Sequence, residues 1–274
     1  MAAVVLVQGA SRGLGLEFCK HILSKKSEAV IIATCRNPEK ALQLKDLGVR
    51  YPEKVTILKV DVTRENEIKQ ASEIVKSKFG KVDLLINSSA MLLPSGKGET
   101  SLRDVSCEGL VATLTTNTVG PLVMAKYFSP LLMKGSGAFG QQTADESKHH
   151  SGILVNMTAK VGSIGDNRKC FKSLWKNKTR LGGWYSYRMS KAALNMATRN
   201  LSIELGRGRP KVVCVSLHPG TVDTDLSRPY HKNVPKDKLF TTECSVQYLM
   251  NLIDNLSVDK TGKCFAWDGS EVPW

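Results

Sequence analysis

Short apolar runs alternate along the chain with longer segments in which apolar residues recur every three or four positions. Nearly continuous apolar runs are typical of parallel strands buried on both faces, and a period near 3.6 is typical of amphipathic helices. The predicted strands span 3–8, 29–35, 55–60, 82–87, 152–158, 212–217 and 264–267. The predicted helices span 14–25, 39–47, 64–79, 102–133, 187–205 and 242–255.

This alternation predicts an α/β fold. Because strand–helix–strand crossovers are right-handed, the helices should cover both faces of a doubly wound, seven-stranded, mostly parallel sheet. A length of 274 residues suits one such domain and leaves little room for a second. We therefore expect a single domain over residues 1–274.

Two segments interrupt the pattern. Residues 135–151 are rich in Gly, Ser and Gln and carry His149 and His150 without further ligand spacing, so we expect a surface loop with exposed histidines and no metal site. Residues 166–183 are rich in Lys and Arg and lie between the fifth predicted strand and the helix at 187–205. In a doubly wound sheet this position is near the carboxyl edge, where ligands bind.

Composition excludes several classes of protein. Apolar residues make up 42% of the chain and charged residues 23%, which is typical of a globular protein rather than a disordered or membrane one. The apolar N-terminus lacks preceding basic residues, so we expect a first strand and not a signal peptide. The seven cysteines are scattered and form no Cys-x-x-Cys pair, which favours reduced thiols and a cytoplasmic protein.

A net charge of +14 is one feature of nucleic-acid-binding proteins. No helix-turn-helix, zinc-finger or aromatic RNA-binding signature accompanies it, and much of the excess lies within residues 160–180. We expect this stretch to be a solvated basic loop, with the binding of acidic ligands or partners as the alternative. Neither nucleic acid nor a membrane is an expected partner.

A glycine-rich turn follows the first predicted strand and opens the first predicted helix. Glycine permits a tight turn and the close approach of a phosphate, and the N-terminus of a helix attracts negative charge. This position predicts a dinucleotide site, with a plain strand-to-helix turn as the alternative. The residues concerned are Gly9, Ser11, Arg12, Gly13, Leu14 and Gly15.

The end of the second predicted strand indicates which dinucleotide binds. Such sites often place an acid there to hold the ribose 2′-hydroxyl. The chain instead reads Thr34-Cys35-Arg36. Arg36, together with Arg12, is suited to bind a 2′-phosphate, with plain surface charges as the alternative. The sequence favours NADP(H) over NAD(H).

Tyr187 and Lys191 lie four residues apart on a predicted helix and therefore share one of its faces. An ammonium beside a phenol favours the phenolate, so we expect Lys191 to lower the pKa of Tyr187 and to improve it as a proton donor and acceptor. Such a spacing is common by itself. It becomes informative because the glycine-rich turn is present in the same chain.

With these motifs the chain resembles the short-chain dehydrogenase/reductase family, and within it the sniffer-type carbonyl reductases and C-factor-like proteins. The resemblance covers nearly the whole chain and implies a Rossmann fold. The further motifs that carry it, in the family's order, are Thr34-Cys35-Arg36-Asn37, Asp61-Val62-Thr63, Thr116-Asn117-Thr118-Val119-Gly120-Pro121, Ser216-Leu217-His218-Pro219-Gly220 and Asp268-Gly269-Ser270.

The resemblance implies hydride transfer between NADP(H) and a small-molecule carbonyl or alcohol substrate. It implies that Tyr187 exchanges the substrate proton, that Lys191 holds the nicotinamide ribose, and that Asn117 holds a water that relays protons from Lys191. It also implies a homodimer that pairs through the helices at 102–133 and 187–205. The other cofactor contacts that it implies, besides the glycine-rich turn and Arg36, are Asp61, Val62, Asn87, Pro219, Gly220, Val222 and Thr224.

Three positions depart from the family pattern. Gln8 stands where the family has a threonine, and Asn87-Ser88-Ser89-Ala90 stands in place of Asn-Asn-Ala-Gly. We expect these two to alter packing near the cofactor rather than chemistry. The third is Ala159, at the position of the catalytic serine. Losing one hydrogen-bond donor to the substrate oxygen typically lowers turnover by about 10²–10³-fold.

Ala159 leaves two functions open: an oxidoreductase of weakened or specialised activity, and an NADP(H)-binding sensor or scaffold that has lost its chemistry. Thr158 should point to the opposite face of its strand. Ser163 lies beyond the site, so neither hydroxyl replaces the serine without a rearranged loop. The complete set of Tyr187, Lys191 and Asn117 favours the enzyme.

Overall fold

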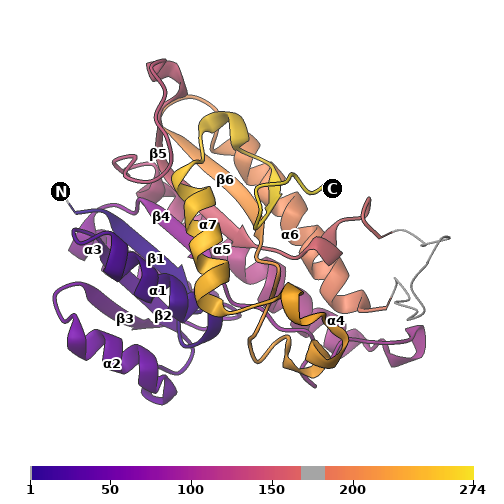
Figure 1. The fold of residues 1–274 in the computed structure, drawn as a ribbon. Coiled ribbons are helices and arrows are strands. Elements are labelled where there is room, and N and C mark those ends of the chain that lie inside the picture. Colours follow the sequence, from indigo (N-terminus) through magenta and orange to yellow (C-terminus); the bar gives the residue numbers. More distant parts are fainter. Residues whose placement is uncertain (1, 168–182) are drawn as a thin grey trace.

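The computed structural model describes residues 2–167 and 183–274 (Figure 1). Seven strands form one sheet in the order β3-β2-β1-β4-β5-β6-β9, and every neighbouring pair is parallel. The predicted doubly wound α/β fold is confirmed, with a sheet that is parallel throughout. The strands are β1 (Val4–Gln8), β2 (Val30–Cys35), β3 (Val55–Lys59), β4 (Leu84–Asn87), β5 (His150–Met157), β6 (Lys211–His218) and β9 (Cys264–Ala266).

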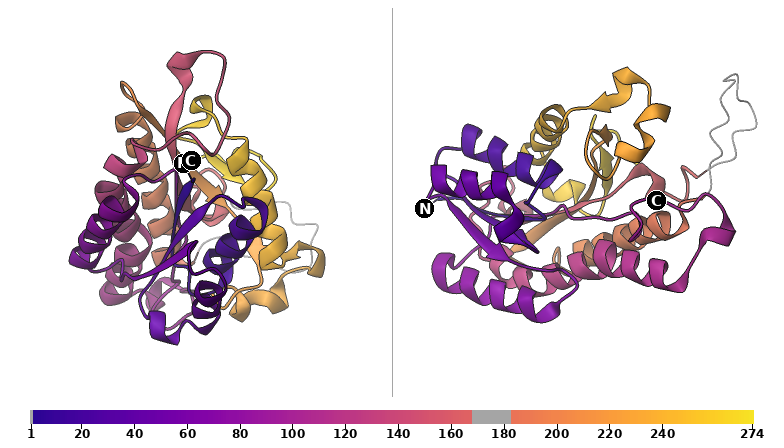
Figure 2. Two further views of the ribbon diagram at one scale, coloured as in Figure 1. Left: turned by 90° about the vertical axis from the view of Figure 1, so that its left-hand side faces the viewer. Right: turned by 90° about the horizontal axis from the view of Figure 1, so that it is seen from below.

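Helices cover both faces of the sheet (Figure 2). Helices α1, α2 and α7 pack against one face, and α3, α5 and α6 against the other. In β1, Val5 and Val7 enter the first core while Val4 and Leu6 enter the second, because side chains alternate along a strand. The helices are α1 (Gly13–Lys25), α2 (Leu42–Arg50), α3 (Glu65–Phe79), α4 (Cys107–Leu114), α5 (Gly120–Leu132), α6 (Tyr185–Glu204) and α7 (Thr242–Asp254).

The helix predicted at 102–133 is divided into several pieces. A short 3₁₀ turn comes first, and Ser106 then begins α4 by accepting a hydrogen bond from the N–H of Gly109 (3.1 Å). Between α4 and α5 lies a π-helical turn, η3 (Thr115–Val119). The side chain of Asn117 in this turn hydrogen-bonds the backbone of Met91. Such π turns often mark functional positions, and a tertiary contact of this kind is invisible in the local hydrophobic pattern.

The segment 135–151 is more ordered than the predicted surface loop. Phe139 is 1% exposed and packs in the core beneath α1 and α7. His149 is exposed as expected, but the expectation is wrong for His150, which is 4% exposed and lies with its Nε2 2.9 Å from the carbonyl oxygen of Phe139. The reason is that β5 begins at His150, two residues earlier than predicted. Most of the basic insert at 166–183 lies outside the described residues.

The carboxyl ends of the parallel strands all lie at one edge of the sheet, so the segments that follow β1, β4, β5 and β6 converge there. After β6, a small second sheet pairs β7 (Thr221–Val222) with β8 (Leu239–Phe240) in parallel. No helix within residues 2–167 and 183–274 is long and apolar enough to cross a membrane.

Candidate active site

The glycine-rich turn between β1 and α1 has the geometry of a phosphate cradle. Gly9 and Gly13 adopt positive φ angles of 85° and 56°, which glycine tolerates. A Cβ on Gly15 would lie 2.2 Å from the carbonyl oxygen of Gly9, so the start of α1 packs directly on the turn. The first turn of α1 carries no acidic residue. The backbone N–H groups at the helix N-terminus therefore fit a phosphate group.

The two arginines assigned to the 2′-phosphate differ in their surroundings. Arg36 follows β2 and is exposed, and the described residues give it no acidic partner. Arg12 forms an ion pair with Asp225 (3.2 Å), which also pairs with Arg228 (2.8 Å). Arg12 would have to share or exchange its partner in order to bind a phosphate. Arg36 is therefore the arginine that is free to receive one.

The expected adenine contacts follow β3. Asp61 Oδ1 accepts hydrogen bonds from the N–H and hydroxyl of Thr63 (3.0 and 2.7 Å), which fixes the turn into α3. Val62 is 6% exposed, and a Cβ on Gly120 would lie 2.7 Å from its Cβ. The start of α5 thus packs closely on Val62. These contacts hold the main chain of residues 61–63 at the carboxyl edge.

Asn87 ends β4 with its side chain directed into the molecule. Its Nδ2 donates to Asn156 Oδ1 (2.8 Å) on the neighbouring strand, while its Oδ1 is buried without a partner. An unpartnered buried acceptor is uncommon in proteins. Asn156 in turn donates to Thr198 on α6 (2.9 Å), which also accepts from Ser216 on β6 (3.0 Å). This buried network holds α6 against the ends of three strands.

The residues expected to cover the nicotinamide follow β6 and lie beside the glycine-rich turn. The carbonyl oxygen of Pro219 accepts from the hydroxyl of Ser245 on α7 (2.8 Å). Gly220 has a φ of 80°, and a Cβ there would lie 2.7 Å from the Phe240 ring. Val222 is 4% exposed within the small sheet. A Cβ on Gly13 would lie 3.5 Å from Thr224 Cγ2, so this segment and the glycine-rich turn face each other.

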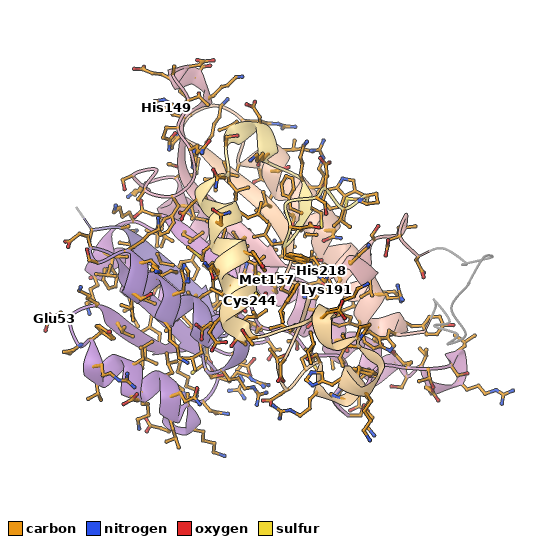
Figure 3. The ribbon with its side chains drawn as sticks, in the orientation of Figure 1. Glu53, His149, Met157, Lys191, His218 and Cys244 are labelled. Atoms are coloured by element: carbon orange, nitrogen blue, oxygen red, sulfur yellow. The ribbon has the colours of Figure 1, made fainter. Side chains whose placement is uncertain are left out.

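Tyr187 and Lys191 share one face in the first turns of α6, as predicted. Both are buried, with exposed fractions of 6% and 1%. The amine of Lys191 donates to the carbonyl oxygen of Met157 at the end of β5 (2.7 Å) and lies 5.7 Å from the centre of the Tyr187 ring. Figure 3 labels Lys191 and Met157, which come from α6 and β5. The pair is thereby anchored at the carboxyl edge of the sheet.

Burial governs the protonation of this pair. It raises the pKa of Tyr187, because removal from water penalises the phenolate. It lowers the pKa of Lys191 to about 7, because it penalises the ammonium. The expectation that Lys191 lowers the pKa of Tyr187 is thus wrong for the polypeptide by itself, since burial outweighs the neighbouring amine. Tyr187 keeps its proton at neutral pH and is suited to donate it.

The side chain of Asn117 is held by hydrogen bonds to the segment after β4 and to α6. Its Oδ1 accepts from the N–H of Met91 (2.8 Å), and its Nδ2 donates to the carbonyl oxygen of Met91 (2.8 Å) and to Ser190 Oγ (3.0 Å). The hydroxyl of Ser190 donates a hydrogen bond to the carbonyl oxygen of Tyr187 (2.8 Å). Because both amide donors are committed to protein groups, the carboxamide fixes α6 to the segment after β4. A proton-relay water at this side chain could therefore only donate a hydrogen bond to Asn117 Oδ1.

Neither of the two hydroxyl-bearing neighbours of Ala159, Thr158 and Ser163, is free to replace the hydroxyl of the expected serine. Thr158 is 3% exposed and donates to Asn195 Oδ1 on α6 (2.8 Å), so its hydroxyl hydrogen is already bonded to a protein acceptor. Ser163 is 2% exposed and accepts from the N–H of Asp166 (3.0 Å). Lys160 is exposed and pairs with Asp166 (3.4 Å). Position 159, where the family resemblance predicts a serine hydroxyl, is therefore apolar.

Three further residues lie at this edge to which the sequence assigned no role. The Trp184 ring lies 6.0 Å from the ring of Tyr187 and 4.5 Å from that of Tyr230, forming an aromatic wall beside the tyrosine. Glu99 is buried against the start of α6. His218 ends β6, and burial lowers its pKa to about 4, so it is neutral at pH 7. Trp184 lies three residues before Tyr187 and His218 lies inside the motif that ends at Gly220, so both had a sequence signal, whereas Glu99 had none.

Comparisons with known proteins agree with this geometry. Residues 3–167 match the family model for the short chain dehydrogenase. The C-signal protein of Myxococcus xanthus is 34% identical over 196 residues, which cover 71% of this chain and 94% of that protein. The NADPH-bound carbonyl reductase from chicken fatty liver is 30% identical with a TM-score of 0.81, covering 100% of this chain and 99% of that one. The carbonyl reductase Sniffer of D. melanogaster is 28% identical with a TM-score of 0.81 over the full length of both chains.

Proposed function

The chain belongs to the short-chain dehydrogenase family, and we propose that it is an NADP(H)-dependent oxidoreductase that interconverts a carbonyl and an alcohol. The observation that carries this proposal is the buried pair of Tyr187 and Lys191, set on α6 at the same sheet edge as the glycine-rich turn. The similar structure from chicken fatty liver has NADPH bound. Arg36 supports the same cofactor in this chain, because it stands where an acid would select NAD(H).

The roles of the residues follow from their places. When bound, NADPH supplies the hydride that reduces the carbonyl carbon. The N-terminus of α1 holds the pyrophosphate through backbone N–H groups. Tyr187 donates its proton to the carbonyl oxygen as the hydride arrives. One hydrogen of the Lys191 amine is bonded to the carbonyl oxygen of Met157, and its remaining hydrogens hold the ribose hydroxyls.

The segments around the cofactor complete this proposal. Asp61 and Val62 border the adenine, and Pro219 to Thr224 cover the nicotinamide opposite the glycine-rich turn. Asn87 offers its unpartnered Oδ1 to the cofactor as a hydrogen-bond acceptor. Asn117 acts by holding α6 in place through Ser190. In the reverse direction Tyr187, once deprotonated, would accept the proton of the alcohol.

A second function is favoured by one observation, the alanine at position 159. An NADP(H)-binding sensor or scaffold would bind the cofactor without turning substrate over. Tyr187 can still act as the acid without the serine, because losing one donor to the substrate oxygen leaves the proton donor in place. The enzyme therefore stays the leading proposal.

One experiment separates the two functions. NADPH binding is measured by fluorescence, and NADPH oxidation is measured against a panel of dicarbonyls and aldehydes, for the wild type and Ala159→Ser. Turnover by the wild type supports the enzyme. Tight NADPH binding with turnover only in Ala159→Ser supports the sensor or scaffold. Failure of the wild type to bind NADPH contradicts both functions.

Further parts of the proposal concern the whole molecule. We propose one domain over residues 1–274 and a cytoplasmic location. The six cysteines in the described part of the chain are all free, which fits a reducing compartment. We also propose a homodimer that pairs through the helices at 102–133 and 187–205, which contain α4, α5 and α6, and where Val111, Leu122, Met189 and Met196 are exposed. Exposed apolar side chains that gather on one face are typical of interfaces.

A further inference from the structure

A buried carboxylate, that of Glu99, lies beside α6 and has no role in the proposed chemistry. Glu99 follows β4, is 2% exposed, and forms no ion pair with any side chain that the structure describes. Its Oε1 accepts hydrogen bonds from the N–H of Ser186 (3.1 Å) and from the hydroxyl of Ser186. Its Oε2 is buried without a partner. Carboxylates are rarely buried unpaired, so this one requires a reason.

The start of α6 explains what the carboxylate binds. The residue before the helix, Trp184, has a φ of 52° and its side chain caps no N–H group, and the first turn carries no acid. The first N–H groups of a helix need acceptors and carry partial positive charge. Glu99 supplies an acceptor and a negative charge from 87 residues away in sequence. Its own carbonyl oxygen also accepts from the N–H of Trp184 (2.6 Å).

We propose that Glu99 is a positioning residue for Tyr187, a role that rests on the proposed function of that tyrosine. It holds Ser186, the residue directly before Tyr187, by two hydrogen bonds. On the other side, Ser190 holds the carbonyl oxygen of Tyr187. The backbone that carries the phenol is thereby fixed from both directions. A displacement near 1 Å at a reacting group can cost about 10²-fold in rate, so such fixing matters for turnover.

The position of Glu99 is itself set by two neighbours. The N–H of Gly98 donates to the hydroxyl of Tyr230 in the segment after β6 (2.6 Å). A Cβ on Gly98 would lie 2.8 Å from the indole of Trp184, so this glycine lets the ring pack against the main chain. The segments after β4 and β6 and the start of α6 therefore meet at Glu99. A helix cap alone would need only a local Ser or Asp at position 184. The buried carboxylate instead ties the helix to both substrate-side segments.

The test compares Glu99→Ala and Glu99→Gln with a matched control, Asp83→Asn. Asp83 is also a buried carboxylate, but it pairs with Lys81 (2.9 Å) and accepts hydrogen bonds from Val4 and Ser136 at the opposite, amino edge of the sheet. Glu99→Ala should lower kcat by about 10-fold or more and leave KM for NADPH within about threefold, because tyrosine placement suffers and cofactor binding does not. Glu99→Gln keeps one acceptor oxygen and should recover part of kcat. Asp83→Asn should lower Tm and leave kcat within about threefold.

Two results would overturn the role: unchanged kcat in Glu99→Ala, or equal kcat losses in Glu99→Ala and Asp83→Asn at equal losses of Tm. Hydrogen exchange provides a readout that needs no turnover. The N–H of Arg188, which donates to the carbonyl oxygen of Trp184 (2.8 Å), should exchange at least about tenfold faster in Glu99→Ala than in Asp83→Asn, with Glu99→Gln between the two. Unchanged exchange refutes the positioning. Faster exchange in a protein whose wild type lacks turnover upholds the positioning and refutes only the proposed function.

Discussion

Gln8 and Ser89 form a hydrogen-bonded pair across the carboxyl ends of β1 and β4. Gln8 Oε1 accepts from the hydroxyl of Ser89 (2.8 Å) and from its N–H (3.2 Å). These are two of the positions at which the chain departs from its family, and the structure shows that they contact each other. A Cβ on Gly9 would lie 2.7 Å from the N atom of Ser89, so the pair also borders the glycine-rich turn. The two departures therefore contact each other directly.

Separate removal of the two partners should reveal this coupling. Gln8→Ala leaves the N–H and hydroxyl of Ser89 without their acceptor, and Ser89→Ala leaves one of the two bonds intact. A double-mutant cycle of urea unfolding should give a coupling free energy of about 1 kcal/mol. Ser24→Ala serves as the control, because its hydroxyl bonds only His21 within α1. Additive effects of Gln8→Ala and Ser89→Ala would contradict the pairing.

Restoring a hydroxyl at position 159 should raise activity. Ala159→Ser returns a donor to the place where the substrate oxygen is expected, and kcat should rise by about 10-fold or more. Steady-state rates of NADPH oxidation with a dicarbonyl measure the change. The control is Ser163→Ala, whose buried hydroxyl accepts from Asp166, and its kcat should stay within about threefold. A rise in neither kcat nor kcat/KM for Ala159→Ser would show that another group supports the substrate oxygen.

Arg36 should select NADPH over NADH. Arg36→Ala removes a charge-assisted hydrogen bond to the 2′-phosphate, worth about 1.5–3 kcal/mol, so the Kd for NADPH should rise by about 10–100-fold. The Kd for NADH should stay nearly constant, because it carries no 2′-phosphate. Titration of both dinucleotides checks this, with the exposed Lys40→Ala nearby as the control. Equal weakening of both dinucleotides would place Arg36 elsewhere in the site.

Burial of Lys191 should make stability depend on pH. Its folded-state pKa of about 7 lies below its ordinary value of 10.5, so between these values the unfolded chain binds a proton that the folded chain does not. The free energy of unfolding therefore rises with pH through this window, and below pH 7 the full penalty is present. Lys191→Met should lose activity and yet be more stable than the wild type at pH 6, with the gain shrinking toward pH 10.

Urea unfolding of both proteins without added NADP(H), from pH 6 to pH 10, measures this difference. Lys69→Met, at an exposed position on α3, provides the control and should show no comparable pH dependence. A stability gain of the same size at every pH would mean that Lys191 lowers the free energy of unfolding through poor packing and not through its buried charge.

The proposed homodimer should depend on the exposed face of α6. Met189, Met196 and Ile203 are spaced by seven residues and are 50%, 61% and 43% exposed, so they form one apolar stripe. Met196→Lys places a charge in its centre and should shift sedimentation from dimer to monomer. Leu42→Lys, at a position on α2 that is 75% exposed, should leave the dimer intact. A wild type that sediments as a monomer across a concentration series would refute this interface.

The order along the chain of the seven strands in the main sheet, the glycine-rich turn and the shared face of Tyr187 and Lys191 could all be predicted from the sequence, whereas the division of the helix at 102–133 and the small sheet of β7 and β8 could not. The features that could be predicted are local properties, because the period of the apolar residues, the backbone freedom of glycine and the helical spacing act over a few residues. The sequence also identified Ala159 through its place in a motif.

Tertiary structure decided the protonation of the site and its support. Burial, which reverses the expected shift in the pKa of Tyr187, depends on what packs around the ring. The bonds of Ser89 with Gln8 and of Ser186 with Glu99 join residues 81 and 87 positions apart. No local pattern encodes such pairs. They exist because the parallel sheet brings the segments after β1 and β4 and the start of α6 to one edge.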